Sequence, residues 1–524
     1  NAQLADYKAG KTPILRGTHG MIGKQASTLC KTPDLCPQFT VQMSWSAGDH
    51  LVCRETIKDV KELKGKTIAI QRNGPHEKFL LAVLQEDAGL KWEDVKVEWM
   101  NNITQAGSPP EVFRNNKAID CAFAVTPDML GMTGGLTSKG DGSEGTIPGA
   151  HVLVSTAHRR RTIADGFAFA TTFVQENPDW VRNFTAAYLK SVEKVIELRH
   201  AYEGSTGSPE FSSLLAFAVK TWTPEVVPNE EEAFGLYLDA SFVGHAGNVK
   251  FFDPNNPDAG HKRFATQAND LGQILGIADA RVPMPPSSID WGHAVFKGLK
   301  SVNVTQGQKF NTEAARAEIE SLNKRGILAD NTVLSFEAFF DKDQINFDAE
   351  RYAPQFNEVI KLTESYSRAP IVIQGHTDST KLVASVLRAG MRSGAIKQAG
   401  TPGNYSYSIQ GKPLDLKNAQ QIMALIQKPE FNSGPKGTNP MDIARGAEDL
   451  SMQRAIACRA ALMAYAKDKG RPLDQSQIQV IGSGAKDPFI VKPRSEKEAS
   501  LNRRVRFSIV RVSTEAATPA DYEL

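Results

Sequence analysis

The pattern of hydrophobic and polar positions divides the chain into a first part, residues 1–300, and a second part, residues 330–512. In the first part, short apolar or alternating runs predict strands separated by helices. The predicted strands cover residues 39–45, 67–70, 95–100, 118–126 and 152–156. This alternation is typical of an α/β fold with a parallel sheet, which we expect for residues 1–300.

Small polar residues stand at the carboxyl ends of these predicted strands. Ligands of parallel α/β sheets bind at that edge, and the free N–H groups of the helices that follow suit an anion. The candidate ligand-binding residues are Thr18, Ser46, Ala47, Gly48, Asn73, Gly74, His76 and Thr126. The alternative is that Ser46 and Thr126 only satisfy loop backbone groups and that His76 lies on the surface.

In the second part, a short buried strand at 371–374 ends at Gly375, which leaves Asp378 just beyond the strand, where its carboxylate can face a ligand. Further elements are predicted as strands at 333–339, 477–481 and 505–509 and as helices at 355–367 and 451–469. Their order predicts an α+β domain with a mixed sheet and helices on one face. Residues 301–329 are predicted to be a linker with a charged helix, and 513–524 a tail.

Charge and apolar content exclude some classes of protein. Lys and Arg number 61 and Asp and Glu 59, a balance that argues against nucleic acid as a partner. No apolar run approaches the roughly 18 residues of a membrane-spanning helix. Residue 1 is Asn and no signal peptide follows it, so we expect that the chain begins after processing or lacks the start of its gene product. The three consecutive arginines at 159–161 are expected in a solvated loop, or beside an acidic neighbour.

Five cysteines give one candidate disulfide. Cys30 and Cys36 flank a loop-like spacer and could form a local disulfide or remain two reduced thiols. Cys53, Cys121 and Cys458 lie in apolar contexts and are expected in the core. No His or Cys pair stands nearby at ligand spacing, so neither a metal nor a cofactor is expected.

Three motifs follow one another in the second part: GHTD at 375–378, LSMQRA at 450–455 and NRRV at 502–505. Together they resemble the peptidoglycan-binding domain at the C-terminus of OmpA-like proteins. The resemblance implies that Asp378 binds the ammonium, and Arg454 the carboxylate, of a diaminopimelate end group, with Arg454 in the first turn of its helix. The implied site residues are His376, Thr377, Asp378, Leu450, Ser451, Arg454, Asn502, Arg503 and Arg504. The alternative is a structural ion pair between Asp378 and Arg454, with surface charges at 503 and 504.

The second part departs from that family in two places. The family usually has about fifteen residues between its Asp and its Arg, so residues 381–446 form an insertion, with predicted helices at 382–396 and 416–427 and turns at 400–412. Ala447 stands where the family commonly has Asn.

Several stretches of the first part resemble the solute-binding proteins of ABC importers, nearest to the nitrate, sulfonate and thiamine-precursor binders. These stretches are DVKELKGKTIAIQ at 59–71, AIDC at 118–121, VLVST at 152–156 and NPDWV at 177–181. The resemblance implies a two-lobed α/β domain in which Ser155 and Thr156 belong to the second lobe's side of the cleft. Such proteins usually have a further strand–helix–strand before the point where this chain starts, so the first lobe is expected to be incomplete.

These features predict a non-enzymatic periplasmic protein of a Gram-negative-type bacterium, attached to peptidoglycan and presenting a domain for a small anionic solute. The alternative is a wall-anchored scaffold whose first domain binds a protein partner of a cell-envelope membrane complex and no solute. The chain has no Gly-x-Ser-x-Gly, no His-Glu-x-x-His and no phosphate loop, which argues against an enzyme.

Overall fold

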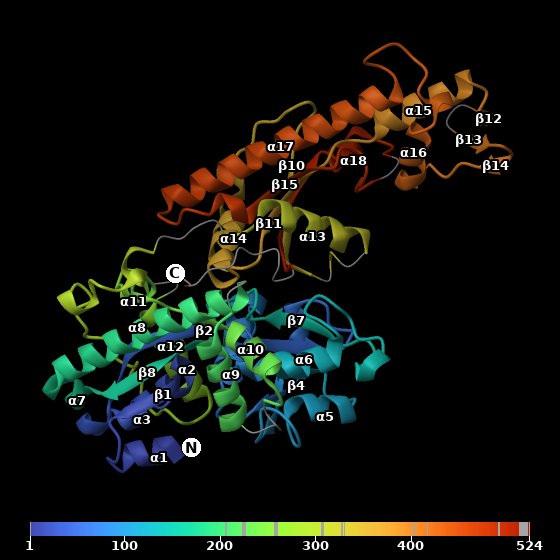
Figure 1. Cartoon of the computed structure of the whole chain (residues 1–524). Coiled ribbons are helices and arrows are strands. Elements are labelled where there is room, and N and C mark those ends of the chain that lie inside the picture. The colour runs from blue at the N-terminus through green and yellow to red at the C-terminus, as the bar shows by residue number, and fades with distance from the viewer. Residues whose placement is uncertain are drawn as a thin grey trace. The chain divides into compact units, whose positions relative to one another are not determined.

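The computed structural model describes residues 2–204, 207–222, 227–255, 260–304, 309–325, 328–329, 331–401, 404–416, 418–490, 493–512 and 522. The chain forms two compact units, which Figure 1 colours by residue number. The first unit comprises Asn1–Lys309, Lys361–Arg368 and Val512–Leu524, and the second Phe310–Ile360 and Ala369–Arg511. Apart from Tyr522, the predicted tail lies outside the described residues.

One lobe of the first unit is an antiparallel sheet with the order β1-β8-β2-β9. Its strands are β1 (Ile14–Thr18), β2 (Pro37–Ser46), β8 (Ala164–Ala170) and β9 (Ala240–Phe242). The helices of this lobe are α1 (Ala2–Lys8), α2 (His19–Gly23), α3 (Ala26–Leu29), α11 (His245–Phe252) and α12 (His261–Ile274). Phe39, Trp45, Phe251 and Phe264 share its core. A parallel sheet was predicted here, so that prediction is wrong for this lobe.

The other lobe is a mixed sheet with the order β5-β4-β6-β3-β7. Its strands are β3 (Asp49–Cys53), β4 (Thr67–Gln71), β5 (Lys96–Met100), β6 (Cys121–Val125) and β7 (His151–Ser155). Its helices are α4 (His76–Ala82), the π-helical turn η3 (Val83–Ala88), α5 (Pro109–Asn115) and α6 (Thr126–Thr133). Strand β4 is parallel to β5 and β6, whereas β3 is antiparallel to both of its neighbours.

The chain crosses between the two lobes after β2 and returns after β7. This gives the first unit the two-lobed fold of a periplasmic-binding-protein-like domain. The chain then continues into α7 (Thr171–Glu176), α8 (Pro178–Glu203), α9 (Pro209–Trp222) and α10 (Glu230–Leu238). None of the helices in the described part of the chain combines the length and the apolar composition needed to cross a bilayer.

The cysteines of the first unit form two disulfides. One joins Cys30 and Cys36, the pair that the sequence singles out. The other joins Cys53 on β3 to Cys121 on β6, which face each other in the antiparallel ladder. These two were expected as core thiols; they are buried, but as a disulfide. In the second unit, Cys458 is a buried free thiol, as expected.

The second unit is built on a mixed sheet with the order β10-β16-β11-β15. Its strands are β10 (Thr332–Phe339), β11 (Ile371–Gly375), β15 (Ile478–Gly482) and β16 (Arg504–Val510), and its helices include α13 (Thr312–Lys324), α14 (Ala353–Ser365), α17 (Pro440–Asp468) and α18 (Glu496–Ser500). A Cβ atom on Gly375 would stand 2.0 Å from the Ser451 carbonyl oxygen, and one on Gly482 2.8 Å from that of Glu448. Two strand-end glycines therefore let α17 lie directly against β11 and β15.

The insertion forms a small subdomain beside one end of α17 (Figure 1). It contains α15 (Thr380–Arg392), the antiparallel strands β12 (Ile396–Thr401), β13 (Asn404–Ile409) and β14 (Lys412–Pro413), and α16 (Ala419–Ile426). The predicted turn region at 400–412 is therefore largely a hairpin. Leu382, Val386, Ile422 and Phe431 pack into a core of its own.

Candidate functional sites

A pocket of about 610 Å³ opens next to the carboxyl end of β11 in the second unit. Five parts of the chain line it: the loop after β10, the loop after β11, the insertion, the middle of α17, and the segment that contains α18. Asp378 and Arg454 both line it, although the whole insertion separates them in sequence. No ion pair joins these two residues, which the structure fully describes, so the alternative of a structural pair does not hold in this conformation.

Arg454 is fully buried and held in place by backbone carbonyls. Its Nε donates to the Gln344 oxygen at 2.9 Å, and its two terminal nitrogens donate at 3.2 Å to His376 and Asp341. Burial, and then the neighbouring Arg503, lowers the pKa of Arg454 to about 10, so it stays charged at neutral pH. A guanidinium has five N–H groups, which leaves one on each terminal nitrogen for a ligand.

Arg454 does not lie in the first turn of its helix, contrary to the prediction. Helix α17 begins at Pro440, where the Asn439 side chain accepts from the Asp442 amide. The free N–H groups of that helix start lie several turns away from Arg454, and their positive potential falls off within about one turn. Its cationic character at the pocket therefore comes from the guanidinium alone.

Asp378 and Thr377 bring oxygen atoms to the same pocket. Asp378 is half-buried, and one carboxylate oxygen accepts from the Thr380 hydroxyl at 2.9 Å. Thr377 is 5% exposed, and its hydroxyl has no hydrogen-bond partner within the described chain. A buried hydroxyl without a partner carries a free-energy cost, which a ligand in the pocket can remove.

Other residues of the three motifs divide into lining and supporting residues. Leu450 and Arg503 line the pocket, whereas Ser451 and Asn502 do not. The Ser451 hydroxyl accepts from the Gly484 amide at 2.9 Å, and the Asn502 amide group bonds both backbone groups of Ile490. These two side chains hold the loops around the pocket and do not line it.

Arg504 and His376 are also supporting residues. Arg504 is buried and donates to Glu337 at 2.9 Å, so it is not the surface charge of the alternative. His376 is buried beside it; burial, and then the charge of Arg504, lowers the pKa of His376 to about 3. Neither side chain lines the pocket.

In the first unit, seven of the ten predicted ligand-binding residues meet in a buried polar cluster. They are Ser46, Ala47, Gly48, His76, Thr126, Ser155 and Thr156, gathered around Asp49, His50 and Asp239. We call this set the polar cluster. Its side chains bond one another, so the strand ends do converge as predicted, but most of their polar groups already have partners; His76 Nδ1 has none.

Hydrogen bonds run through the polar cluster in a chain. Thr126 donates to Asp239 at 2.7 Å and therefore accepts from His50 Nε2 at 3.1 Å, which leaves His50 Nδ1 to accept from Ser155. His76 bonds Asp49 at 2.7 Å. Burial lowers the pKa of His50 to about 4, consistent with a neutral imidazole.

Carboxylates gather at the polar cluster, which was expected to suit an anion. Burial, and in second place the charge of Asp49, raises the pKa of Asp165 to about 6. Burial is also the main cause that raises the pKa of Asp239 to about 6. The Asp239 carboxylate lies against Gly48, where a Cβ atom would stand 2.3 Å from Oδ2. An anion would be repelled here.

A cavity in the first unit has the opposite charge to the polar cluster. It has a volume of about 310 Å³, and its lining comes from both lobes: Gly17 from β1, Asn73 from the loop after β4, and the cations Lys8, Arg16 and Lys24, with no carboxylate. We call it the basic pocket. Lys24 is buried and donates to Asn73 Oδ1 at 3.1 Å and to Glu77.

The last two predicted ligand-binding residues of the first unit have structural roles. Thr18 caps α2 by accepting from the Met21 amide at 3.1 Å, and Gly74 packs against the Gln71 side chain. Neither lines the basic pocket. Of the ten predicted residues, Asn73 alone lines it.

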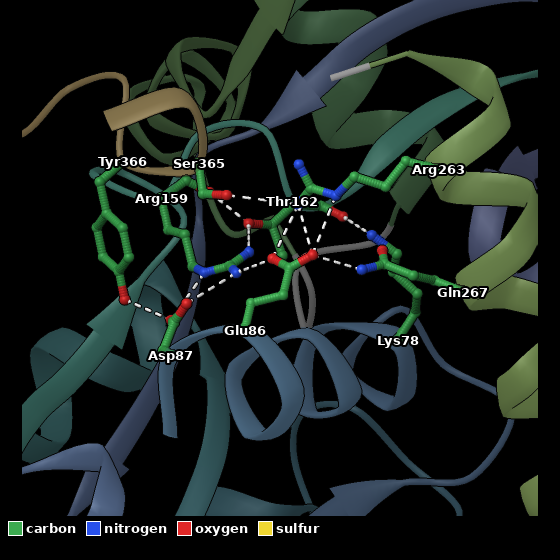
Figure 2. A network of polar contacts seen from close by, with 9 residues as sticks. All are labelled: Lys78, Glu86, Asp87, Arg159, Thr162, Arg263, Gln267, Ser365 and Tyr366. Carbon is green, nitrogen blue, oxygen red and sulfur yellow. Dashed lines mark hydrogen bonds and ion pairs between the residues drawn. The ribbon is translucent and has the colours of Figure 1, made fainter. Parts of the chain in front are cut away.

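A buried ion-pair network joins the two lobes, and Figure 2 shows its members. Arg159, in the segment between β7 and β8, donates to both oxygens of Asp87 at 2.9 and 3.0 Å and to Glu86. Arg263 of α12 donates to Glu86 at 3.0 Å from the other lobe. The network therefore connects η3, the crossing segment and α12. Of the two environments expected for residues 159–161, a solvated loop or an acidic neighbour, Arg159 has the second.

Lys78 and Tyr366 complete the ion-pair network (Figure 2). Lys78 donates to the Thr162 carbonyl at 3.1 Å. The segment Lys361–Arg368 belongs to the first unit, and Tyr366 in this segment donates to Asp87 at 2.7 Å. Burial alone would raise the pKa of Glu86. The charges of Arg159 and Arg263 outweigh burial and lower this pKa to about 2. Glu86 is therefore ionised throughout the physiological range.

Several of these residues carry little signal in the sequence. Asp49 and His50 directly follow the predicted Gly48, so a candidate range longer by two residues would have included them. Asp239 lies at the end of a helix far along the chain, and Arg16 and Lys24 are ordinary surface residue types. Their juxtaposition depends on how the two lobes close, which no local pattern encodes.

One family model and several solved structures are similar to parts of this chain. Residues 50–198 match the model of the NMT1/THI5 like family. Among solved structures, the chain is similar to the putative periplasmic sulfonate-binding protein of a sulfonate ABC transporter from Methylobacillus flagellatus KT (18% identity, 57% of this chain and 79% of that chain, TM-score 0.37). It is also similar to the periplasmic aliphatic sulphonate binding protein of Escherichia coli (15%, 54% and 76%, 0.35).

A third similar structure is the desulfurization enzyme DSZB (12% identity, 53% of this chain and 84% of that chain, TM-score 0.30). No curated relative matches the chain by sequence. What these findings give for the first unit is a two-lobed fold of the periplasmic-binding-protein kind and a family match over residues 50–198.

Proposed function

We propose that the second unit binds the diaminopimelate end group of peptidoglycan stem peptides and so attaches the chain to the cell wall. That end group carries one ammonium and one carboxylate. The observation that supports the proposal is that Asp378 and Arg454 line one pocket without pairing with each other. The chain would then act, without enzymatic activity, in the periplasm of a Gram-negative-type bacterium.

Each side chain of the proposed site has a distinct task. Arg454, fixed by three carbonyls, would bind the ligand carboxylate with its two remaining N–H groups, in the bidentate geometry that a guanidinium favours. Asp378 would accept from the ammonium, and the unpartnered Thr377 hydroxyl would bond the same end group.

Sedimentation of the full chain with purified peptidoglycan tests this function. Asp378→Asn keeps the size of the side chain and removes its charge, so we expect at least a tenfold loss of bound protein. Asp468→Asn, at the exposed end of α17, is the matched control and should bind as the unmodified chain does. Unchanged sedimentation of the Asp378 variant would refute the site.

For the first unit, the proposed ligand is a small anionic solute in the basic pocket. Lys8 and Arg16 without a lining carboxylate support this charge, since Lys24 is already paired with Glu77. The volume of about 310 Å³ is at the small end of the volumes of ligand pockets. All six tryptophans lie between residues 45 and 291, so tryptophan fluorescence reports unfolding of the first unit alone.

Thermal unfolding with sulfate, phosphate and an alkyl sulfonate, followed by that fluorescence, tests the solute. A binding anion at about 100 times its Kd stabilises by about 2.7 kcal/mol, and Arg16→Gln should abolish the shift. Arg281→Gln, an exposed control, should retain it.

The alternative of a scaffold that binds an envelope membrane-complex protein also has an observation in its favour. The polar cluster and the ion-pair network leave the polar groups between the lobes bonded to one another. A domain held closed in this way suits a rigid scaffold better than a module that opens and closes. The absence of a thermal shift with every anion would favour this alternative.

A further inference from the structure

We propose that the pocket of the second unit also binds a second carboxylate of the stem peptide, and that Lys381 of the insertion is the cation that binds it. The inference rests on the proposed function. It adds the recognition of a free carboxylate on the residue next to diaminopimelate, which in stem peptides is a γ-linked glutamate whose α-carboxyl is either free or amidated.

The volume of the pocket exceeds what the end group needs. The end group has five heavy atoms: the ammonium nitrogen, the carbon that bears it and the three atoms of the carboxylate. At up to about 30 Å³ for each atom, the volume of a water molecule in the liquid, it takes roughly 100–150 Å³. The pocket measures about 610 Å³. More than half of it therefore remains for the neighbouring residue of the peptide.

Charge in the pocket is also unbalanced. Its ionisable lining residues are Lys342, Asp343, Asp378, Lys381, Arg454, Arg494, Glu496 and Arg503, five cations against three carboxylates. Arg503 bonds Glu496 at 2.6 Å. A zwitterionic end group would neutralise Asp378 and Arg454 and leave the cationic excess in place, so the remaining volume suits an anion.

Position favours Lys381 among the remaining cations. Lys342, Lys381 and Arg494 form no ion pair within the described chain. Lys381 stands three residues after Asp378 and directly follows Thr380, whose hydroxyl bonds Asp378. The next residue, Leu382, is buried in the core of the insertion and fixes the start of α15 against the pocket. The chain between the end group and the glutamate carboxylate is flexible, so a peptide held at Asp378 and Arg454 can bring that carboxylate back to Lys381 in the same pocket.

The insertion then has a physical role. It brings Lys381, Leu382 and Ile443 to the wall of the pocket. A domain with a short connection at this point would present the end-group site without this cation. Recognition would therefore depend on the amidation state of the peptide.

Two synthetic peptides test the inference on the full chain by isothermal titration calorimetry. Both are L-alanyl-γ-D-glutamyl-diaminopimelate, one with the glutamate α-carboxyl free and one with it amidated. We expect the free acid to bind at least tenfold more tightly. In Lys381→Gln the preference should fall below twofold, with the affinity for the amidated peptide unchanged. Lys397→Gln, exposed on β12, is the matched control and should keep the preference.

Each outcome separates this inference from the function on which it rests. Equal affinity for both peptides in the unmodified chain would overturn the inference and leave end-group binding intact. A preference that persists in Lys381→Gln would overturn the assignment to Lys381. The absence of binding by either peptide would overturn the proposed function itself.

Discussion

The polar cluster of the first unit and the pocket of the second unit use the same kinds of side chain in opposite ways. In the polar cluster, His50, Thr126 and Asp239 bond one another and leave little polarity for a ligand. In the pocket, the Thr377 hydroxyl and the Lys381 ammonium have no partner in the described chain. Both regions lie at the carboxyl ends of strands, so position in the fold does not decide between them.

The two regions differ in when their polar groups gain partners. Those of the polar cluster gain them on folding, and those of the pocket gain them when a ligand binds. A satisfied buried network stabilises one arrangement of the chain, and removal of one member leaves the others unpaired at high cost. A pocket with unpartnered groups gives up that stabilisation and recovers it when a ligand binds. This contrast predicts that substitutions in the first unit change stability, whereas substitutions in the second unit's pocket change affinity.

The largest effect is expected at the ion-pair network. Arg159→Met would leave Glu86 and Asp87 buried without their main cation, so we expect the first unit to lose about 3–5 kcal/mol of stability. Urea unfolding followed by tryptophan fluorescence measures this loss in the first unit.

The control for this experiment is Arg281→Met, which removes an arginine from an exposed pair with Asp270. Such pairs contribute about 0–1 kcal/mol. A loss at Arg159 no larger than that of the control would mean that other contacts hold the lobes together, and the role given to the ion-pair network would fail.

A smaller, pH-dependent effect is expected at Asp239. The pKa of its carboxyl is raised to about 6 in the folded state, so the folded state binds the proton more tightly than the unfolded state does. Folding stability therefore falls as the pH rises from about 4 to 6 and stays reduced above that range. Asp239→Asn keeps an acceptor for Thr126 and removes this penalty, with an expected gain of about 3 kcal/mol at pH 7.5 and almost none at pH 4.

Urea unfolding at the two pH values, again by tryptophan fluorescence, measures this gain, with Asp253→Asn as the exposed control. A stabilisation of equal size at both pH values would show that the charge of Asp239 is not its cause. A pH-dependent gain would identify a carboxylate kept at a cost in the centre of the polar cluster, which is typical of functional sites.

Sequence patterns identified more of the residues that line the second unit's pocket than of those that line the basic pocket of the first unit. The short motifs fix residues next to turns and tight glycines, as at Gly375, so their local geometry is encoded nearby. They identified Asp378 and Arg454, which do line one pocket. They could not separate these from Ser451, which stands one residue after the lining Leu450 and instead bonds Gly484.

Other predictions failed because the competing signals are physically alike. An apolar context fits a buried thiol and a buried disulfide equally well, so Cys53 and Cys121 were not paired in advance. The Gly- and Asn-containing stretch at 400–412 is typical of turns, but its Tyr405 and Tyr407 belong to a strand of a hairpin. The direction of strand pairing depends on contacts far apart in the chain, and the antiparallel lobe was missed for that reason.

The same substitution, threonine to valine, can be made in the polar cluster and in the pocket of the second unit. Thr126→Val removes the partner of His50 and Asp239 in the polar cluster, so we expect a loss of about 1–3 kcal/mol from the first unit. Thr377→Val removes a buried hydroxyl that has no partner, and with it the cost of leaving that hydroxyl unbonded, so the second unit should lose no stability and should gain up to about 1–3 kcal/mol. Affinity for the diaminopimelate peptide should nevertheless fall several-fold, because the hydroxyl's bond to the ligand is lost. Hydrogen exchange of the amides of β6 and β11 reports the two stabilities in one sample. Equal losses in the two variants would mean that Thr377 already has a partner in the folded chain, and the second unit's pocket would then be as closed as the polar cluster.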